Sequence, residues 1–182
     1  MTVYAALLRG INVGGNKKVS MPLLKRMFEE MGFGRVQTYI NSGNVIFEAE
    51  SAEGEAALAE RIEREIERAF GFPVAVMLRT DEELRQALEN NPFASEGTPE
   101  ELHLHVGYLG QLPSEAQLDK IRKYVTENDQ FRLVGRELYV MFKAGMRDSK
   151  LGASMNKLGV PVTLRNWNTA GKLSAMASAK PE

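Results

Sequence analysis

The chain has 182 residues, of which 43% are hydrophobic, and this predicts a folded protein of one ordinary domain or two small ones. Cysteine is absent, which excludes disulfide bonds, thiolate metal sites and a cysteine nucleophile. A net charge of -1 and a pI near 6.2 argue against a broadly basic surface for nucleic acid. No stretch has the pattern of a signal peptide or a membrane span, so we expect a cytoplasmic protein of bacterial type with no membrane partner.

The first half of the chain predicts the order strand, helix, strand, strand, helix, strand, helix. Runs of β-branched and aromatic residues indicate the strands, and apolar residues at helical spacing indicate the helices. Ser20 is a suitable N-cap for the first helix, with Pro22 in its first turn and Gly32 after its end. The predicted ranges are Val3–Leu8, Ser20–Met31, Val36–Ile40, Val45–Glu48, Glu55–Phe70, Val74–Leu78 and Asp81–Leu88.

The second half repeats this order, and the repetition predicts the fold class. Its predicted ranges are Leu102–Leu109, Ser114–Val125, Phe131–Val134, Leu138–Phe142, Ser149–Leu158, Val162–Leu164 and a closing helix from Asn168. We therefore predict an α+β protein of two tandem ferredoxin-like (βαββαβ) units, each with an antiparallel or mixed sheet and helices packed on it. We assign residues 1–90 to the first unit and 91–182 to the second, and expect a monomer or a homodimer.

The connection Arg9–Lys18 is longer than packing requires. A loop between a strand and a helix usually has about 2 to 6 residues, whereas this one adds cations, two asparagines and three glycines. Extra loop of this composition is typically functional.

This loop and the predicted hairpin turn Asn41–Asn44 should lie at one edge of the first sheet. A strand-helix-strand crossover makes strands one and two parallel, so both strands end at the same edge. Donor-rich side chains (including Lys18), glycines that expose N–H groups and a helix N-terminus favour an anion there. The predicted site for a small phosphate-bearing ligand contains Arg9, Asn12, Gly14, Gly15, Asn16, Lys17, Asn41, Ser42 and Asn44. The alternative is structural: the glycines shape a turn, the amides tie it to the hairpin, and the lysines are solvated.

A second candidate patch follows strands three and four of the second unit, which end together at the opposite edge. It consists of Arg147, Ser149, Lys150, Arg165, Asn166, Trp167 and Asn168. Trp167 could stack on a base or ring while its neighbours contact phosphate or carboxylate. Equally, Asn168 or Thr169 would serve as a helix cap and Trp167 as a plug between sheet and helix.

Catalytic and cofactor chemistry has little support in the sequence. The loop lacks the Gly-Lys-Ser/Thr ending of a Walker motif and the spacing of a dinucleotide fingerprint, so we predict no cofactor. His103 and His105 would share one face of a strand, but no partner carboxylate is evident, and we predict no metal. The catalytic residues, if there are any, stay unknown, because neither edge offers a general base or nucleophile beyond hydroxyls such as Ser42 and Ser149.

Two other functions stay open. The strand order is that of single-strand RNA modules, but Ser42–Phe47 carries one aromatic residue where such modules have several, so nucleic acid is not the favoured partner. An enzyme with a site between the two halves is the other alternative.

Four phrases give the chain a family resemblance. They are Leu7–Gly15, Ser42–Val45, Ser149–Leu151 and Arg165–Thr169, and together they resemble the bacterial family DUF1697, a domain of unknown function. The resemblance implies a compact α+β protein of two ferredoxin-like halves, without an established activity, cofactor or catalytic residue. Where the usual phrase of the family is Gly-Arg-Ser-Lys, this chain has Asp148 between Arg147 and Ser149.

Overall fold

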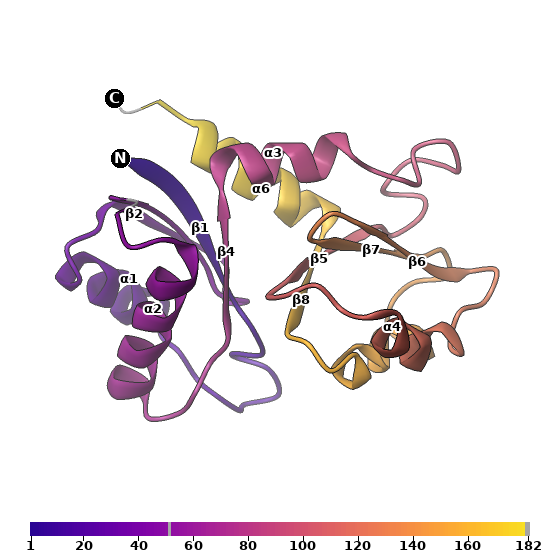
Figure 1. Cartoon of the computed structure of the whole chain (residues 1–182), viewed down its shortest axis with the longest axis horizontal. Helices are drawn as coiled ribbons and strands as arrows, with labels where there is room; N and C mark the ends of the chain where they lie inside the picture. Colours follow the sequence, from indigo (N-terminus) through magenta and orange to yellow (C-terminus); the bar gives the residue numbers. More distant parts are fainter. Residues whose placement is uncertain (51, 181–182) are drawn as a thin grey trace. The chain divides into compact units, whose positions relative to one another are not determined.

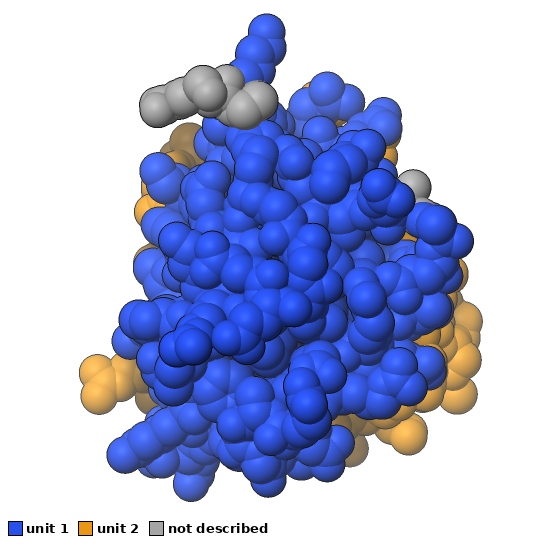
Figure 2. Space-filling model, turned by 90° about the vertical axis from the view of Figure 1, so that its left-hand side faces the viewer, with its two compact units in different colours: residues 1–85, 172–182 blue, residues 86–171 orange. Residues whose placement is uncertain are grey.

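The computed structural model describes residues 1–50 and 52–180, which form a mixed α+β protein (Figure 1). The chain divides into two compact units, which Figure 2 colours separately. Unit 1 contains residues 1–85 and the chain from residue 172 onward, and unit 2 contains residues 86–171. Among the described residues no helix is both long enough and apolar enough to cross a membrane.

Unit 1 is built on a four-stranded antiparallel sheet. Its elements are β1 (Thr2–Leu8), α1 (Met21–Glu30), β2 (Gly34–Tyr39), β3 (Asn44–Ala49), α2 (Glu55–Phe70) and β4 (Val76–Thr80). The strand order is β2-β3-β1-β4, so the first strand lies inside the sheet between the third and the fourth. As predicted, β1 and β2 run in the same direction, because both are antiparallel to β3.

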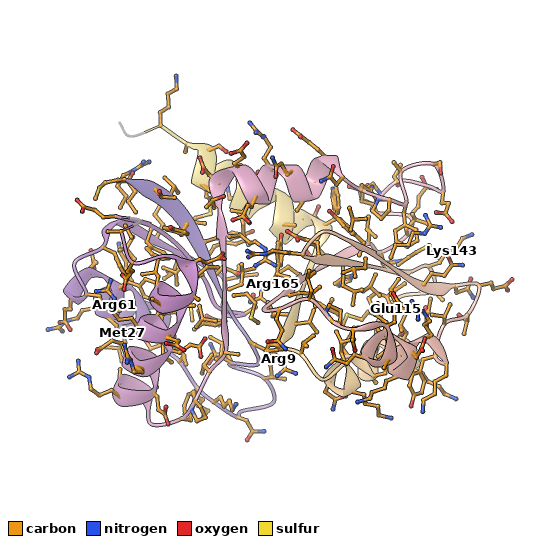
Figure 3. All side chains as sticks on the ribbon, in the orientation of Figure 1. Arg9, Met27, Arg61, Glu115, Lys143 and Arg165 are labelled. Carbon is orange, nitrogen blue, oxygen red and sulfur yellow. The ribbon has the colours of Figure 1, made fainter. Side chains whose placement is uncertain are left out.

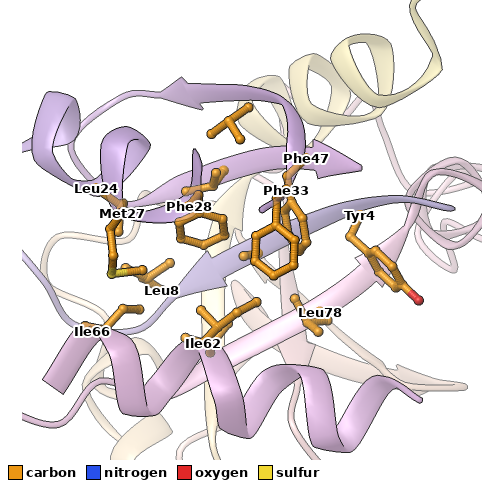
Figure 4. Close-up of a cluster of buried hydrophobic side chains, with 14 of the residues drawn as sticks. Tyr4, Leu8, Leu24, Met27, Phe28, Phe33, Phe47, Ile62, Ile66 and Leu78 are labelled. Carbon is orange, nitrogen blue, oxygen red and sulfur yellow. The ribbon is translucent and has the colours of Figure 1, made fainter. Parts of the chain in front are cut away.

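The core of unit 1 lies between this sheet and helices α1 and α2 (Figure 4). Leu24 and Phe28 from α1 and Ile62 and Ile66 from α2 are fully buried against the sheet. Phe47 of β3 is central, with its ring centroid 5.2 Å from Phe28 and 4.7 Å from Phe33. The helices form because their apolar residues recur at spacings of three and four, which places them on one face. This packing fixes the ends of β1 and β2, where the candidate site begins.

Unit 2 has a second four-stranded antiparallel sheet with the corresponding strand order, β6-β7-β5-β8. After α3 (Asp81–Glu89), which spans the unit boundary, come β5 (His105–Leu109), α4 (Glu115–Arg122), β6 (Asp129–Val134) and β7 (Glu137–Phe142). Then follow the short helix α5 (Lys150–Ala153), the 3-10 turn η1 (Met155–Lys157), β8 (Val162–Asn166) and α6 (Trp167–Ser178). Leu118 and Ile121 of α4 pack on Leu138, Val140 and Phe142 of β7.

Two predicted elements of unit 2 were wrong in extent. The strand expected from Leu102 begins at His105, because Leu102–Leu104 forms a turn in which His103 has φ 46 and Leu104 N donates to Pro99 O at 2.9 Å. The helix expected over Ser149–Leu158 is divided into α5 and η1. Ser154 ends α5, and its hydroxyl donates to the carbonyl oxygen of Leu151 at 2.7 Å, which competes with helical bonding.

Helix α6 begins in unit 2, but its residues from Lys172 belong to unit 1. Met176 and Ala177 border, with Val3 and Ile46 of the sheet, a narrow cavity of ≈ 10 Å³. Arg35 fixes the following residues, since its guanidinium donates to the carbonyl of Ala179 at 3.0 Å. The units therefore differ from the predicted division at residues 90 and 91, which assigned this segment to the second unit. The physical reason is its packing on the sheet of unit 1.

Candidate functional site

The connection after β1 forms a small projecting hairpin. Asn12 N donates to Lys17 O, and Asn16 N donates to Val13 O, both at 3.0 Å. Gly14 and Gly15 are the two turn residues between, with φ 58 and 79. Positive φ at both positions is the requirement of a type I′ turn, which explains the Gly-Gly pair. The predicted loop is thus an ordered hairpin with an exposed tip.

The Asn12 side chain braces this hairpin against the turn after β2. Its Nδ2 donates to Asn41 O at 2.8 Å and to Val19 O at 3.0 Å, and its Oδ1 accepts from Val19 N at 2.8 Å. Asn12 itself has φ 54, a conformation that asparagine tolerates better than most residues. Three hydrogen bonds from one amide therefore hold the two predicted segments together. Because both donors of this amide are used within the chain, Asn12 positions the site.

The turn after β2 contains the other predicted polar residues. Asn44 is fully buried, and its Nδ2 donates to Tyr39 O at 2.9 Å and to Ser42 Oγ at 3.1 Å. The side chain of Asn44 is therefore structural, which corrects its predicted place among the ligand contacts. Gly43 has φ 92, and a Cβ there would lie 2.6 Å from Ile11 Cδ1. Only glycine lets the turn approach the loop this closely.

A hollow of ≈ 560 Å³ opens between the hairpin, the turn and the start of α1. Its lining residues are Asn12, Gly15, Lys18, Val19, Ser20, Met21, Pro22 and Asn41. Ser20 caps α1 by accepting from Leu23 N at 3.4 Å, so the positive end of the helix dipole lies at this hollow. Met21 and Pro22 give it an apolar side that the sequence did not predict as part of the site. Their position in the first turn of the predicted helix, next to the loop, was the sequence signal that could have placed them in the site.

The charges around this hollow are cationic. Lys17 and Lys18 are exposed, and among residues 1–50 and 52–180 no carboxylate lies within ion-pair distance of either lysine. Lys17 Nζ donates to Pro73 O at 3.4 Å, while Lys18 lines the hollow. Arg9 lies at the end of β1, where its backbone N–H donates to Ala75 O at 3.0 Å (Figure 3). Gly14 and Asn16 are exposed at the tip and do not line the hollow.

The second candidate patch is divided between two strands. The ends of β7 and β8 lie on either side of β5, where Phe142 N donates to Leu102 O and Trp167 N donates to Leu104 O, both at 3.0 Å. The two segments therefore share one edge of the sheet, as predicted. Arg147, Lys150 and Asn168 are exposed, and Trp167 is half-buried.

The remaining residues of this patch have structural contacts. Ser149 is buried, caps α5 and donates to Asp129 Oδ2 at 2.8 Å. Asn166 Oδ1 accepts from Thr169 N at 2.8 Å, so Asn166 caps α6 where Asn168 or Thr169 was expected to do so. Arg165 is buried, donates to Thr163 Oγ1 at 2.7 Å, and its burial lowers its pKa to about 10 (Figure 3). These contacts favour the structural reading of the patch.

The two histidines do not share the face of a strand, which corrects the sequence prediction. His103 lies in the turn before β5, and its carbonyl is 2.8 Å from Nδ1 of His105. Burial lowers the pKa of His105, whose ring packs edge-on against Phe142. The described residues contain no group of three or more histidine, aspartate or glutamate side chains placed to hold a metal ion.

Comparison with known proteins agrees with this architecture. The chain matches the family described as a protein of unknown function, DUF1697, over residues 1–139. It belongs to the DUF1697 family. The match includes the Leu7–Gly15 and Ser42–Val45 phrases and ends before the other two. No curated protein matches the chain.

A solved structure supports the fold over nearly all of this DUF1697 chain. It is that of the conserved bacterial protein SP0830 from Streptococcus pneumoniae, which is 26% identical in sequence. The similarity covers 97% of this chain and 99% of that chain, with a TM-score of 0.77. The mixed α+β fold, with two four-stranded antiparallel sheets and helices, is therefore supported by a conserved bacterial protein of known structure.

Proposed function

We propose that this DUF1697 protein binds a small phosphate-bearing anion in the hollow beside α1. The observation that carries the proposal is the brace at Asn12, which holds Gly15, Lys18 and the start of α1 around one hollow of ≈ 560 Å³. A lysine without a carboxylate partner and a helix N-terminus both favour negative charge. The apolar side formed by Met21 and Pro22 suits a ligand that also carries an uncharged portion, as nucleotides and sugar phosphates do.

Backbone conformation at the turn adds support. Ile40 has φ 51, and its side chain is 47% exposed. A β-branched residue in this region is strained by roughly 1–3 kcal/mol, and an exposed isoleucine gains little packing in return. Strain of this kind concentrates at ligand sites, where it holds a surface in its binding conformation. Ile40 directly precedes Asn41, which lines the hollow.

The proposal includes the finer description of the molecule. Each βαββαβ segment, with its sheet order and covering helices, is proposed to be a ferredoxin-like unit, and the two units are proposed to be a tandem pair. The cytoplasm is proposed as the compartment, because a cysteine-free chain has no need of an oxidising one.

A thermal-shift series tests the binding proposal. Wild type, Lys18→Gln and Lys143→Gln would be melted with phosphate, sulfate, nucleotides, sugar phosphates and short RNA. A ligand at about 100 times its Kd stabilises the native state by roughly 2.7 kcal/mol, which raises the Tm of a chain of this size by several degrees. We expect this rise for wild type and Lys143→Gln, and a much smaller one for Lys18→Gln. Lys143 is the matched control, an exposed lysine in unit 2.

Two results would contradict the proposal. If no anion changed the Tm of the wild type, the protein would not bind these anions. If Lys18→Gln and Lys143→Gln showed equal shifts, the anion would bind outside the hollow beside α1. A shift with RNA alone that weakens steeply with salt would indicate the nucleic-acid alternative.

A further inference from the structure

Strand β6 is one of the two edge strands of the unit 2 sheet (Figure 1), and one side of its backbone has no neighbouring strand within the described part of the chain. Lys143 N donates to Asn128 O at 2.8 Å, so this pair is hydrogen-bonded. Hydrogen-bonded and non-bonded pairs alternate along an antiparallel ladder. The register with β7 therefore directs the backbone groups of Gln130, Arg132 and Val134 toward β7 and those of Phe131 and Leu133 away from it. Thr126 N donates to Asp129 O at 2.9 Å on the same open side, as this alternation requires.

Nothing else among residues 1–50 and 52–180 hydrogen-bonds to these outward groups of Phe131 and Leu133. The corresponding strand of unit 1, β2, is protected by contrast. Its register with β3 shifts between Gly34 and Gln37, and Arg35 in this bulge has φ 48 and donates to Ala179 O at 3.0 Å. Bulges and charges are the usual means of protecting a sheet edge. Strand β6 is regular over all six pairs with β7 and has no such bulge.

A partly apolar hollow of ≈ 650 Å³ lies beside this edge. It is lined by Leu118, Val125, Phe131 and Leu133, together with the charged residues Glu115, Arg122 and Arg132. Val125 is 40% exposed and Val134, at the end of the strand, is 36% exposed. An open strand next to exposed apolar side chains is the arrangement that β-strand addition uses.

We propose that β6 pairs antiparallel with β6 of a second copy of this chain, forming a homodimer with a continuous sheet across the interface. The outward groups select the register: Phe131 of one copy lies opposite Leu133 of the other, and Arg132 lies on the two-fold axis. This register forms four backbone hydrogen bonds, because Phe131 and Leu133 each exchange two with the opposite residue.

The charges at this edge are compatible with a two-fold axis. Arg132 of one copy would lie next to Arg132 of the other, which brings two like charges together. Within each chain, however, this guanidinium pairs with Glu96 at 2.8 Å and lies 4.1 Å from the Phe93 ring centroid. Helix α4 packs over the other face of the sheet, on the side of Phe131 and Leu133, and its Glu115 and Arg122 pair within the chain at 2.8 Å. A two-fold axis through Arg132 makes the two copies of α4 antiparallel, which places Glu115 of one copy opposite Arg122 of the other. A second copy therefore pairs the open strand edge, and the Glu115–Arg122 ion pair that each chain already forms lies with its opposite charges facing those of the other copy.

Cysteine cross-linking tests the register, because the wild-type chain has no cysteine. In the proposed dimer the two Arg132 Cα atoms form a non-hydrogen-bonded pair about 4.5 Å apart, within disulfide range. We expect Arg132→Cys to form a covalent dimer on mild oxidation. Gln130→Cys is the matched control on the same strand and face. It lies opposite Val134 of the other copy, so its two thiols are roughly 14 Å apart and should not join.

Light scattering of the full chain over a range of concentrations measures the assembly itself. We expect wild type to reach twice the 20.3 kDa chain mass. Leu133→Pro removes an outward N–H without breaking the ladder to β7, so the dimer Kd should rise at least about tenfold relative to Leu133→Ala, which retains that N–H. A monomer at every concentration would overturn the proposal. A dimer that Gln130→Cys cross-links as readily as Arg132→Cys would overturn it as well.

Discussion

The connection from β1 to α1 and the connection from β5 to α4 join equivalent elements with very different lengths. The first uses residues 9–20, and the second uses only residues 110–114. Both end in a serine N-cap, Ser20 and Ser114. Since unit 2 has the same strand order with the short connection, the topology does not require the long one.

The additional residues of the long connection form a buried base and an exposed tip. Ile11 and Val19 are buried in the core of unit 1, so the base of the loop is part of the packing. Gly14, Gly15 and Lys18 between them are exposed. A buried base with an exposed polar tip is the arrangement of a binding loop on a rigid scaffold. The comparison with unit 2 therefore separates what the fold needs from what a ligand site would add.

The largest difference we predict is between Gly43, in the turn from β2 to β3, and Gly135, in the turn from β6 to β7. Gly43→Ala should destabilise the protein by about 2–4 kcal/mol, because the new Cβ meets Ile11 Cδ1 at 2.6 Å and Leu8 Cβ at 3.0 Å at positive φ. Gly135→Ala, in the equivalent turn of unit 2, meets no atom within 4 Å and should cost only about 1–2 kcal/mol. Urea unfolding measures both. Equal losses would show that the long loop does not pack tightly against its turn.

A smaller difference should separate the residues that hold the two connections. Asn12→Ala removes three hydrogen bonds and should cost about 2–3 kcal/mol. Ser114→Ala removes a capping box, in which Gln117 N donates to Ser114 Oγ at 3.2 Å, and should cost about 1 kcal/mol. Thermal unfolding of the two variants gives the ranking. A lower cost for Asn12→Ala would mean that the hairpin does not depend on its brace.

The smallest effect is a pH dependence that His105 gives to unit 2, which contains both histidines of the chain. Burial lowers the pKa of His105 in the folded state, so below the ordinary histidine pKa of about 6.5 the unfolded state binds more protons. Stability should therefore be complete above this pH and decrease as the pH falls from 7 to 5.5. Denaturant unfolding of wild type and His105→Gln at both pH values tests this. A loss of the same size in the variant would assign the dependence to other groups.

The sequence could predict which segments lie next to one another at the edge of the sheet. It could not predict which of their side chains are buried and which are exposed. The element order implied that β1 and β2 end at one edge, and this brought Asn12 next to Asn41. Composition could not show that Asn44 is buried beneath the turn, because an asparagine in a hairpin is equally suited to an exposed position. Leu102 and Leu104 alternate with polar residues, which is the pattern of a strand and led to the predicted start at Leu102. Both leucines are instead buried in the segment before β5.

The divided course of α6 has a consequence for biosynthesis. The residues from Lys172, which complete unit 1, are synthesised after the whole of unit 2. At about 5–20 residues per second, the nascent chain needs roughly 4–20 s to extend from Arg85 to Lys172. During this interval unit 2 can complete its sheet, while the face of unit 1 that includes Val3 and Ile46 still awaits its covering helix. The first unit to emerge from the ribosome is therefore the last to be finished, and it is the unit that a chaperone would meet incomplete.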